Sequence, residues 1–287
     1  MKKVRILCFG DLVGPTGCAL FQKYAQKMKK NVDAHVIMVN GENVAHNGRG
    51  ITTKAIVSLK HCGADIITGG NHTFQQREAY TYLQEHGDVL RPANFPSACP
   101  GRGVGFVEVD GTKIAFINLQ GRVFMHQHLD CPFKTLESLL SFVKSQASLI
   151  VVDFHAEASS EKIGLALHFD GKVSAVLGTH THAQTADERL LPGGTAFITD
   201  LGMGGSLNSM LGMKQEGILY NIMTQLPTKF EVETQSPFVL SGVLLELDAA
   251  SGRAVSIERF RVVDEELKMQ GETSKGDGSK NVREEQE

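Results

Sequence analysis

In the first third of the chain, short apolar runs rich in β-branched residues alternate with segments whose apolar positions recur at helical spacing. The runs predict strands at residues 4–9, 35–39 and 65–68. The helical spacing predicts helices around residues 20–28, 51–61 and 76–86. This strand–helix alternation is typical of a parallel β-sheet that is covered by helices.

The pattern changes after this opening, because three pairs of apolar runs flank turn residues. Residues 104–109 and 113–119 flank Asp110-Gly111, which is a strong hairpin signal. Similar pairs flank residues 192–194 and 250–253. Between the hairpins we expect helices at 134–144 and 159–168 and strands at 148–154 and 173–177. The fold class is therefore α/β, with a mixed sheet or a two-sheet sandwich between helices.

Two long segments and the C-terminal end lack a regular apolar pattern. Residues 120–132 and 202–213 are rich in Gly, Met and His, and loops of this length are often functional. Residues 265–287 contain few apolar side chains and predict a disordered tail. We therefore expect one catalytic domain over residues 1–264, with loop or cap insertions near 120–133 and 200–215.

Polar side chains that can bind metals or transfer protons follow five of the predicted strands. In an open α/β sheet, the carboxyl ends of parallel strands share one edge, where ligands bind. The five groups should therefore converge on one site. In chain order, the groups are Asp11, then Glu42 and Asn43, then Asn71 and His72, then His155, and finally His180 and His182.

The chemistry of these donors indicates two metal ions. Carboxylate and amide oxygens with imidazole nitrogens, and no thiolate, suit Mn, Fe, Zn or Ni. The donors are too many for one ion, and paired ions lie ~3.5–4 Å apart in known two-metal sites. Two divalent ions carry four positive charges, of which Asp11 and Glu42 offset two. The remaining two match one hydroxide and one phosphodiester anion.

Composition limits the partners and the cellular compartment that we expect for this protein. The 29 basic and 32 acidic residues give a net charge of −3, so nothing draws the whole chain to nucleic acid or an anionic membrane. No run approaches the ~20 apolar residues of a membrane span. The five cysteines form no CxxC pair, which favours reduced thiols in a cytoplasmic protein. A homo-oligomer is compatible with all of this.

The ordered set of motifs resembles a known family. The motifs are Asp11, Gly41-Glu42-Asn43, Gly70-Asn71-His72, His155 and Gly178-Thr179-His180-Thr181-His182. They resemble the calcineurin-like metallophosphoesterase signature, and more closely its YmdB-like bacterial branch, of the 2′,3′-cyclic-nucleotide phosphodiesterase type. The resemblance runs from Val4 to about Val263. It implies a four-layer sandwich of mixed β-sheets flanked by helices.

The resemblance also implies a role for each residue, with one departure from the wider superfamily. The usual Asp-x-His motif has Val13 at its third position, and Asn43 stands where the YmdB-like branch supplies the missing ligand. Asp11, Asn43 and His182 would bind the first metal, and Glu42 would bridge. Asn71, His155 and His180 would bind the second metal, while His72 stands near the leaving group. The implied metal is iron, with manganese or zinc as alternatives.

The leading hypothesis is a dinuclear phosphodiesterase in which a metal-bound hydroxide attacks phosphorus and His72 protonates the departing alkoxide. The resemblance suggests cyclic nucleotides, especially 2′,3′-cyclic mononucleotides, as substrates. A phosphomonoesterase or protein phosphatase on the same site is an alternative, as is a regulatory protein that binds a phosphate ligand without turnover. Three further histidines, His46, His126 and His128, lie in predicted loops. Each is either a surface residue or part of the substrate pocket, and for His126 and His128 metal binding is a further alternative.

Overall fold

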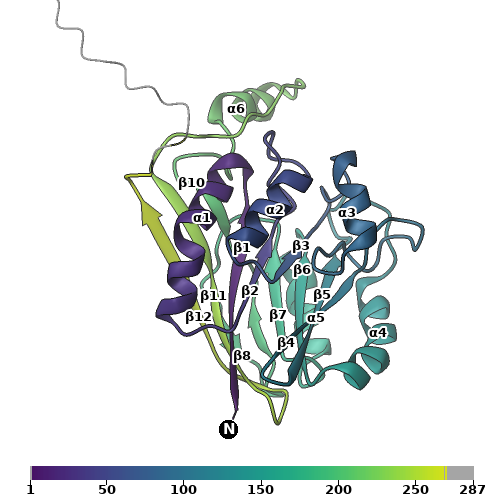
Figure 1. The fold of residues 1–287 in the computed structure, drawn as a ribbon. Helices are drawn as coiled ribbons and strands as arrows, with labels where there is room; N and C mark the ends of the chain where they lie inside the picture. The colour runs from purple at the N-terminus through teal and green to yellow at the C-terminus, as the bar shows by residue number, and fades with distance from the viewer. Residues whose placement is uncertain (1, 268, 270–287) are drawn as a thin grey trace, which may run out of the picture.

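A computed structural model describes residues 2–267 and 269, which form two six-stranded β-sheets packed against each other (Figure 1). This arrangement confirms the α/β class with mixed sheets that the sequence predicts. The predicted tail over 265–287 falls largely on residues 268 and 270–287, which lie outside the described residues. At its start, Leu267 and Met269 pack against the core under the first sheet.

The first sheet combines the N-terminal strands with the last hairpin. Its strands are β1 (Lys3–Leu12), β2 (Val36–Asn40), β3 (Ile66–Thr68), β10 (Met203–Ser206), β11 (Phe238–Asp248) and β12 (Ala254–Asp264). They follow the order β12-β11-β10-β1-β2-β3. β1, β2 and β3 are parallel, as predicted, and β11 runs antiparallel to β1. The N-terminal strand thus lies inside the sheet, with its carboxyl end beside that of β2.

The second sheet has a parallel centre with a hairpin at each edge. Its strands are β4 (Val104–Val109), β5 (Thr112–Gln120), β6 (Leu149–His155), β7 (Ala175–Thr179), β8 (Arg189–Leu190) and β9 (Ala196–Ile198). They follow the order β4-β5-β6-β7-β9-β8, and β5, β6, β7 and β9 are parallel. The predicted turn at Asp110-Gly111 has positive φ at both residues, which is the geometry of a two-residue hairpin loop.

Helices cover the outer face of each sheet and complete four layers (Figure 1). Helices α1 (Gly14–Asn31) and α2 (Thr53–His61) pack on the first sheet, and α4 (Pro132–Gln146) and α5 (Ser159–His168) on the second. Alternation along β1 divides its side chains: Ile6 and Cys8 face the second sheet, while Leu7 and Phe9 face the helices. The four-layer sandwich implied by the resemblance is therefore confirmed.

Local sequence explains where most helices begin. Proline occupies the first turn of both α1 and α4, where its missing N–H costs nothing. The Thr52 side chain accepts a hydrogen bond from the Ala55 backbone N–H and caps α2. The helix predicted over residues 76–86 is instead a 3₁₀ turn, Arg77–Ala79, followed by the short helix α3 (Tyr80–Glu85).

The prediction of a loop over residues 202–213 is wrong in part, because this segment contains β10. Met203–Ser206 has no β-branched residue, so it carries no strand signal of its own. It forms a strand because β1 offers it a parallel partner from Asp11 to Leu12. The following helix α6 (Gln215–Thr224) was not predicted, and lies at the end of the molecule opposite the N-terminus (Figure 1). In the part of the chain that the structure describes, we find no helix long and apolar enough to cross a membrane.

Candidate metal centre

The carboxyl ends of strands from both sheets meet at one place and bring the predicted site residues together. Asp11 is the last residue but one of β1, and Asn71 and His72 follow β3. His155 ends β6 of the second sheet. All seven predicted metal ligands and His72 belong to one connected set of side-chain and backbone contacts: Asp11, Glu42, Asn43, Asn71, His72, His155, His180 and His182.

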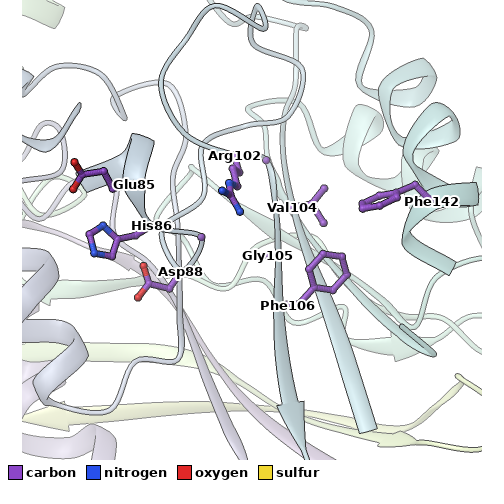
Figure 2. A pocket seen from close by; sticks show the side chains of 10 residues that line it. Glu85, His86, Asp88, Arg102, Val104, Gly105, Phe106 and Phe142 are labelled. Carbon is purple, nitrogen blue, oxygen red and sulfur yellow. The ribbon is translucent and has the colours of Figure 1, made fainter. Parts of the chain in front are cut away.

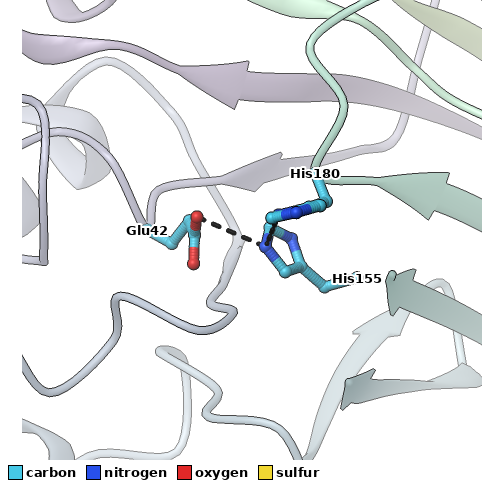
Figure 3. A group of neighbouring side chains, drawn as sticks. All are labelled: Glu42, His155 and His180. Atoms are coloured by element: carbon cyan, nitrogen blue, oxygen red, sulfur yellow. Dashed lines mark hydrogen bonds and ion pairs between the residues drawn. The ribbon is translucent and has the colours of Figure 1, made fainter. Parts of the chain in front are cut away.

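Three donors of the predicted second-metal set point at one another from three different strands. Glu42, His155 and His180 each offer a ligand atom, and these atoms all lie within 4.8 Å of one another. Figure 3 shows the three side chains turned toward one another. His155 Nε2 is 3.3 Å from Glu42 Oε1 and 3.0 Å from His180 Nδ1. The fourth predicted donor, Asn71 Oδ1, lies 2.9 Å from the same His155 nitrogen. Two imidazole nitrogens and two oxygens that converge in this way fit a cation between them.

The partner of His155 on its other ring nitrogen fixes the tautomer. His155 Nδ1 lies 3.0 Å from Thr179 Oγ1, and the Thr179 hydroxyl donates to Asp153 Oδ1 at 2.7 Å. Because that hydroxyl proton is already used, Thr179 can only accept from His155, so Nδ1 carries the hydrogen. In the neutral ring, the lone pair of Nε2 then faces the centre, which is the arrangement that a metal ligand needs.

The other two predicted histidine ligands are oriented in the same manner. His180 Nε2 lies 3.0 Å from Glu157 Oε2, and His182 Nδ1 lies 2.9 Å from the backbone oxygen of Leu211. Each outward nitrogen therefore meets an acceptor and carries the hydrogen. Both histidines have positive φ, which turns the chain after β7 back so that both rings face inward.

Asp11 presents a carboxylate oxygen that no described protein group satisfies. Asp11 Oδ2 accepts the His180 backbone N–H at 3.1 Å, but Oδ1 is buried without a hydrogen bond from any described residue. The nearest side-chain nitrogens include His155 Nδ1 at 3.7 Å and His182 Nε2 at 3.9 Å. A buried carboxylate oxygen is costly when it is unpaired, and a bound cation would satisfy it.

Asn43 lies between two histidines of the centre, with its amide nitrogen toward His182. Asn43 Nδ2 is 3.0 Å from His182 Nε2, and Asn43 Oδ1 is 2.9 Å from His72 Nδ1. Coordination through oxygen beside His182 would need the amide to turn over. Asn43 is buried at the junction of His72 and His182.

Burial and close charges shift the acidity of the central groups. Burial raises the pKa of Asp11 to about 6, although His182 and His155 act in the opposite direction. Burial lowers the pKa of His180 to about 3, and His155 adds to this. Burial also disfavours charge on His155, but the carboxylates of Glu42, Asp11 and Asp153 together outweigh it and raise the pKa of His155 to about 9. The protein groups by themselves therefore attract positive charge to the space between Glu42 and His155.

His72 is held beside the donors with one ring nitrogen left over. Its Nδ1 lies 3.0 Å from Glu42 Oε1 and 2.9 Å from Asn43 Oδ1, and both of these atoms are acceptors. The His72 backbone N–H also donates to Glu42 Oε2 at 2.9 Å. Nδ1 is therefore the protonated nitrogen, and the partly exposed ring keeps Nε2 available for a group outside this network.

Sequence reasoning missed the buried carboxylate that organises the centre from below. Asp153 is fully buried in β6 and accepts hydrogen bonds from Asn40 Nδ2 at 3.1 Å, from Thr179 and from Thr68. The signal was present, because an acidic residue inside an apolar parallel strand must have partners. Its partners come from β2, β3 and β7, so sequence did not identify them.

A second missed element is a buried ion pair below the turn that carries His180 and His182. Lys162 Nζ of α5 lies 2.8 Å from Asp200 Oδ2, and both side chains are fully buried. The same Asp200 oxygen accepts the Thr181 backbone N–H at 3.0 Å. The pair thus connects α5 to the turn between the two histidines.

A pocket of about 520 Å³ opens beside the centre. Of the three loop histidines without an assigned role, His46, His126 and His128, only His126 lines it. His126 lines it together with His72 and His180. His46 lines two other pockets, and His128 is exposed on the same loop as His126.

A larger pocket of about 760 Å³ lies along the edge strand β4, and its lining contains none of the predicted metal ligands. Figure 2 shows its polar side chains apart from the rings of Phe106 and Phe142; they are Glu85, His86, Asp88 and Arg102. The smaller pocket is lined by Asn71, His72 and His180 of the convergent set, and by Glu157, which orients His180. The smaller pocket is therefore the candidate site.

Comparison with known proteins matches this arrangement to one family. The family model described as YmdB-like protein matches residues 7–260. The 2′,3′-cyclic-nucleotide 2′-phosphodiesterase of Bacillus subtilis (strain 168) is 44% identical over 264 residues, which cover 92% of this chain and 99% of that protein.

Two solved structures share the fold over nearly the whole chain. A phosphatase from Mycoplasma pneumoniae superposes with a TM-score of 0.87 at 32% identity, covering 92% of this chain and 95% of that one. A protein from Thermus thermophilus superposes with a TM-score of 0.83 at 35% identity, covering 91% of this chain and 100% of that one.

Proposed function

The chain belongs to the YmdB-like protein family, and from this premise we propose that it is a metal-dependent phosphodiesterase acting on cyclic nucleotides, with 2′,3′-cyclic mononucleotides as its preferred substrates. The observation that carries the proposal is the convergence of Glu42, His155 and His180 within 4.8 Å. The activity of the Bacillus subtilis relative supports the choice of substrate.

We propose that the predicted ligands hold two ions. Asp11, Asn43 and His182 would hold one ion and Asn71, His155 and His180 the other, with Glu42 between them. When bound, such ions activate water and offset the charge of a transferring phosphoryl group. Iron suits this oxygen and nitrogen donor set, with manganese and zinc as alternatives. The unpaired Asp11 Oδ1 and the opposed nitrogens of His155 and His180 support this assignment.

Within this proposal, His72 carries hydrogen on both ring nitrogens and delivers the Nε2 proton to the leaving oxygen. Its Nδ1 is engaged by Glu42 and Asn43, so the ring is oriented and Nε2 points away from those two acceptors. A ribose alkoxide is a poor leaving group and needs that proton in the transition state.

The test compares ester classes on the purified full-length chain. Hydrolysis of 2′,3′-cyclic AMP, a bis-nitrophenyl diester and a nitrophenyl monoester is measured with added Mn²⁺ and after treatment with chelator. We expect both diesters to be cleaved faster than the monoester, and chelator to abolish turnover. Preference for the monoester would favour a phosphatase, and binding without turnover would favour a regulatory protein.

We also propose that residues 1–264 act as one catalytic unit in the cytoplasm, with the loops near 120–133 and 200–215 around the site. All five cysteines are free thiols. Burial raises the pKa of Cys18 to about 12 and keeps that thiol protonated and unreactive. These features support a protein made for a reducing compartment.

A further inference from the structure

The pocket beside His72 contains an aromatic side chain that the chemistry described so far does not use. Phe124 lies in the loop between β5 and α4, and 84% of its surface is exposed. It lines the same pocket of about 520 Å³ as Asn71, His72 and His180. We infer that Phe124 forms a nucleobase subsite, on which the base of a nucleotide stacks while its phosphate occupies the candidate metal centre. The inference rests on the proposed function.

The loop that presents Phe124 is fastened on both sides of it. The Glu161 carboxylate of α5 accepts the backbone N–H groups of Arg122 and Val123 at 3.1 Å. After Phe124, Gln127 accepts from Gln120 at 3.0 Å and donates to the backbone oxygen of Asn71 at 3.2 Å. The loop is thereby connected to the strand end that carries a predicted ligand, so the backbone that carries Phe124 is tethered beside the centre.

Phe124 has the size and chemistry that a base requires. The ring takes no part in the described hydrophobic cores. The volume of the pocket lies in the range of about 300–1,000 Å³ that small-molecule sites occupy. A base–aromatic stack tolerates every base, because each has a π-face, and it favours purines through their larger area. The subsite should therefore accept all four bases and prefer purine nucleotides.

The first experiment compares two substrates that share the reacting group. 2′,3′-cyclic AMP and glycerol 1,2-cyclic phosphate both contain a five-membered cyclic phosphate, but only the first has a base. In Phe124→Ala, the ratio of kcat/KM for the nucleotide to that for the glycerol ester should fall about 5- to 100-fold, the range expected when one base stack is lost. Phe142→Ala, which removes an exposed ring at the other pocket, should keep the wild-type ratio. An unchanged ratio in Phe124→Ala would overturn the inference.

The second experiment measures the stack without turnover. The chain contains no Trp, so Phe124→Trp introduces a single indole fluorophore. Adenosine 3′-monophosphate should quench its fluorescence, while glycerol phosphate should not, and Phe142→Trp should respond to neither. Quenching without cyclic-nucleotide hydrolysis would leave the subsite standing and remove the proposed activity. Hydrolysis without quenching would do the reverse.

Discussion

Each carboxylate and imidazole of the centre depends on one or two neighbouring atoms for its orientation. His155 offers Nε2 to the centre because Thr179 takes its other nitrogen, and Thr179 can do so because its own proton goes to Asp153. Glu42 and His72 are in contact, yet their proposed roles differ. Loss of the Glu42 charge should reduce metal content, whereas loss of the His72 ring should reduce turnover alone.

Replacement of Glu42 by Gln keeps the shape of the side chain and removes its charge. Glu42 is buried beside His155, and the proposed bridging position offsets repulsion between two cations. We expect Glu42→Gln to lose at least one ion and nearly all turnover while keeping the fold. Elemental analysis, activity and circular dichroism measure these three quantities. Glu137→Gln on the exposed surface of α4 is the matched control, and near-normal activity in Glu42→Gln would remove Glu42 from the site.

Replacement of His72 by Ala tests proton delivery separately from metal binding. A ribose alkoxide needs a proton to depart and a nitrophenolate needs little help, and general acid catalysis contributes roughly 10²–10⁴-fold. We expect His72→Ala to reduce hydrolysis of 2′,3′-cyclic AMP by about that factor and hydrolysis of a nitrophenyl diester much less.

The metal content of the His72→Ala variant shows why its activity is lost. It should stay near the wild-type level, because the His72 nitrogen faces Glu42 and Asn43 and lies outside the predicted ligand set. Equal losses on both substrates with metal also lost would make His72 a ligand. Equal losses with metal retained would indicate substrate positioning.

At the residue scale, sequence reasoning identified the side chains that end strands and missed those that act through a partner. Asp11 and His155 were found because each follows an apolar run, and parallel strands share an edge. Lys162 and Asp200 were not found. Their roles arise only when α5 lies below the turn after β7. No local pattern encodes that contact.

At the element scale, the turn residues predicted the hairpins, whereas β10 and α6 have no signal of their own in the sequence. The Asp110-Gly111 turn carries its own signal, because few residues accept positive φ. β10 has no such signal and depends on β1 for its partner. α6 contains apolar residues but buries none of its side chains among the described residues, so no core-facing stripe marked it in the sequence.

The buried pair between α5 and the β7 turn should contribute strongly to stability. Lys162→Met would leave the Asp200 carboxylate buried without its cation, and breaking such a pair costs about 3–5 kcal/mol. Denaturant unfolding should show this loss, accompanied by weaker metal binding, since Asp200 also holds the Thr181 N–H between two predicted ligands. Combining Lys162→Met with Asp200→Asn should recover part of the loss. A cost below about 1 kcal/mol, typical of exposed pairs, would contradict this role.

Helix α6 should be the least protected of the long helices. It has no buried residue, whereas α1 buries six along its length. Amides that are held only by exposed helical hydrogen bonds exchange through local opening. Hydrogen exchange followed by mass spectrometry should show α6 exchanging well before α1, at the same rate with and without metal. Protection of α6 equal to that of α1 would instead indicate that a partner covers it in solution.

At the scale of the whole molecule, the centre exists only where the two sheets meet. β1, β2 and β3 bring donors from one sheet and β6 and β7 from the other. Alternating side chains on both inner faces fill the space between the sheets and fix their spacing. Strand periodicity predicted a mixed sheet or a sandwich. The four-layer arrangement followed only from the family resemblance, because contacts between sheets leave no local sequence pattern.

Metal binding should therefore stabilise the entire fold. Donors as distant in sequence as Asp11 and His182 come together only in the folded chain, so ions bind the folded state and not the unfolded one. An ion present at 100 times its dissociation constant adds about 2.7 kcal/mol, and in a chain of this size each 1 kcal/mol shifts Tm by about 2–4 °C. Elemental analysis should find about two ions per chain, which together add about 5 kcal/mol, so calorimetry after chelation should show Tm lower by about 10–20 °C. The shift should shrink in Glu42→Gln and persist in Glu137→Gln. An identical Tm before and after removal of all metal would mean that these side chains satisfy one another without an ion.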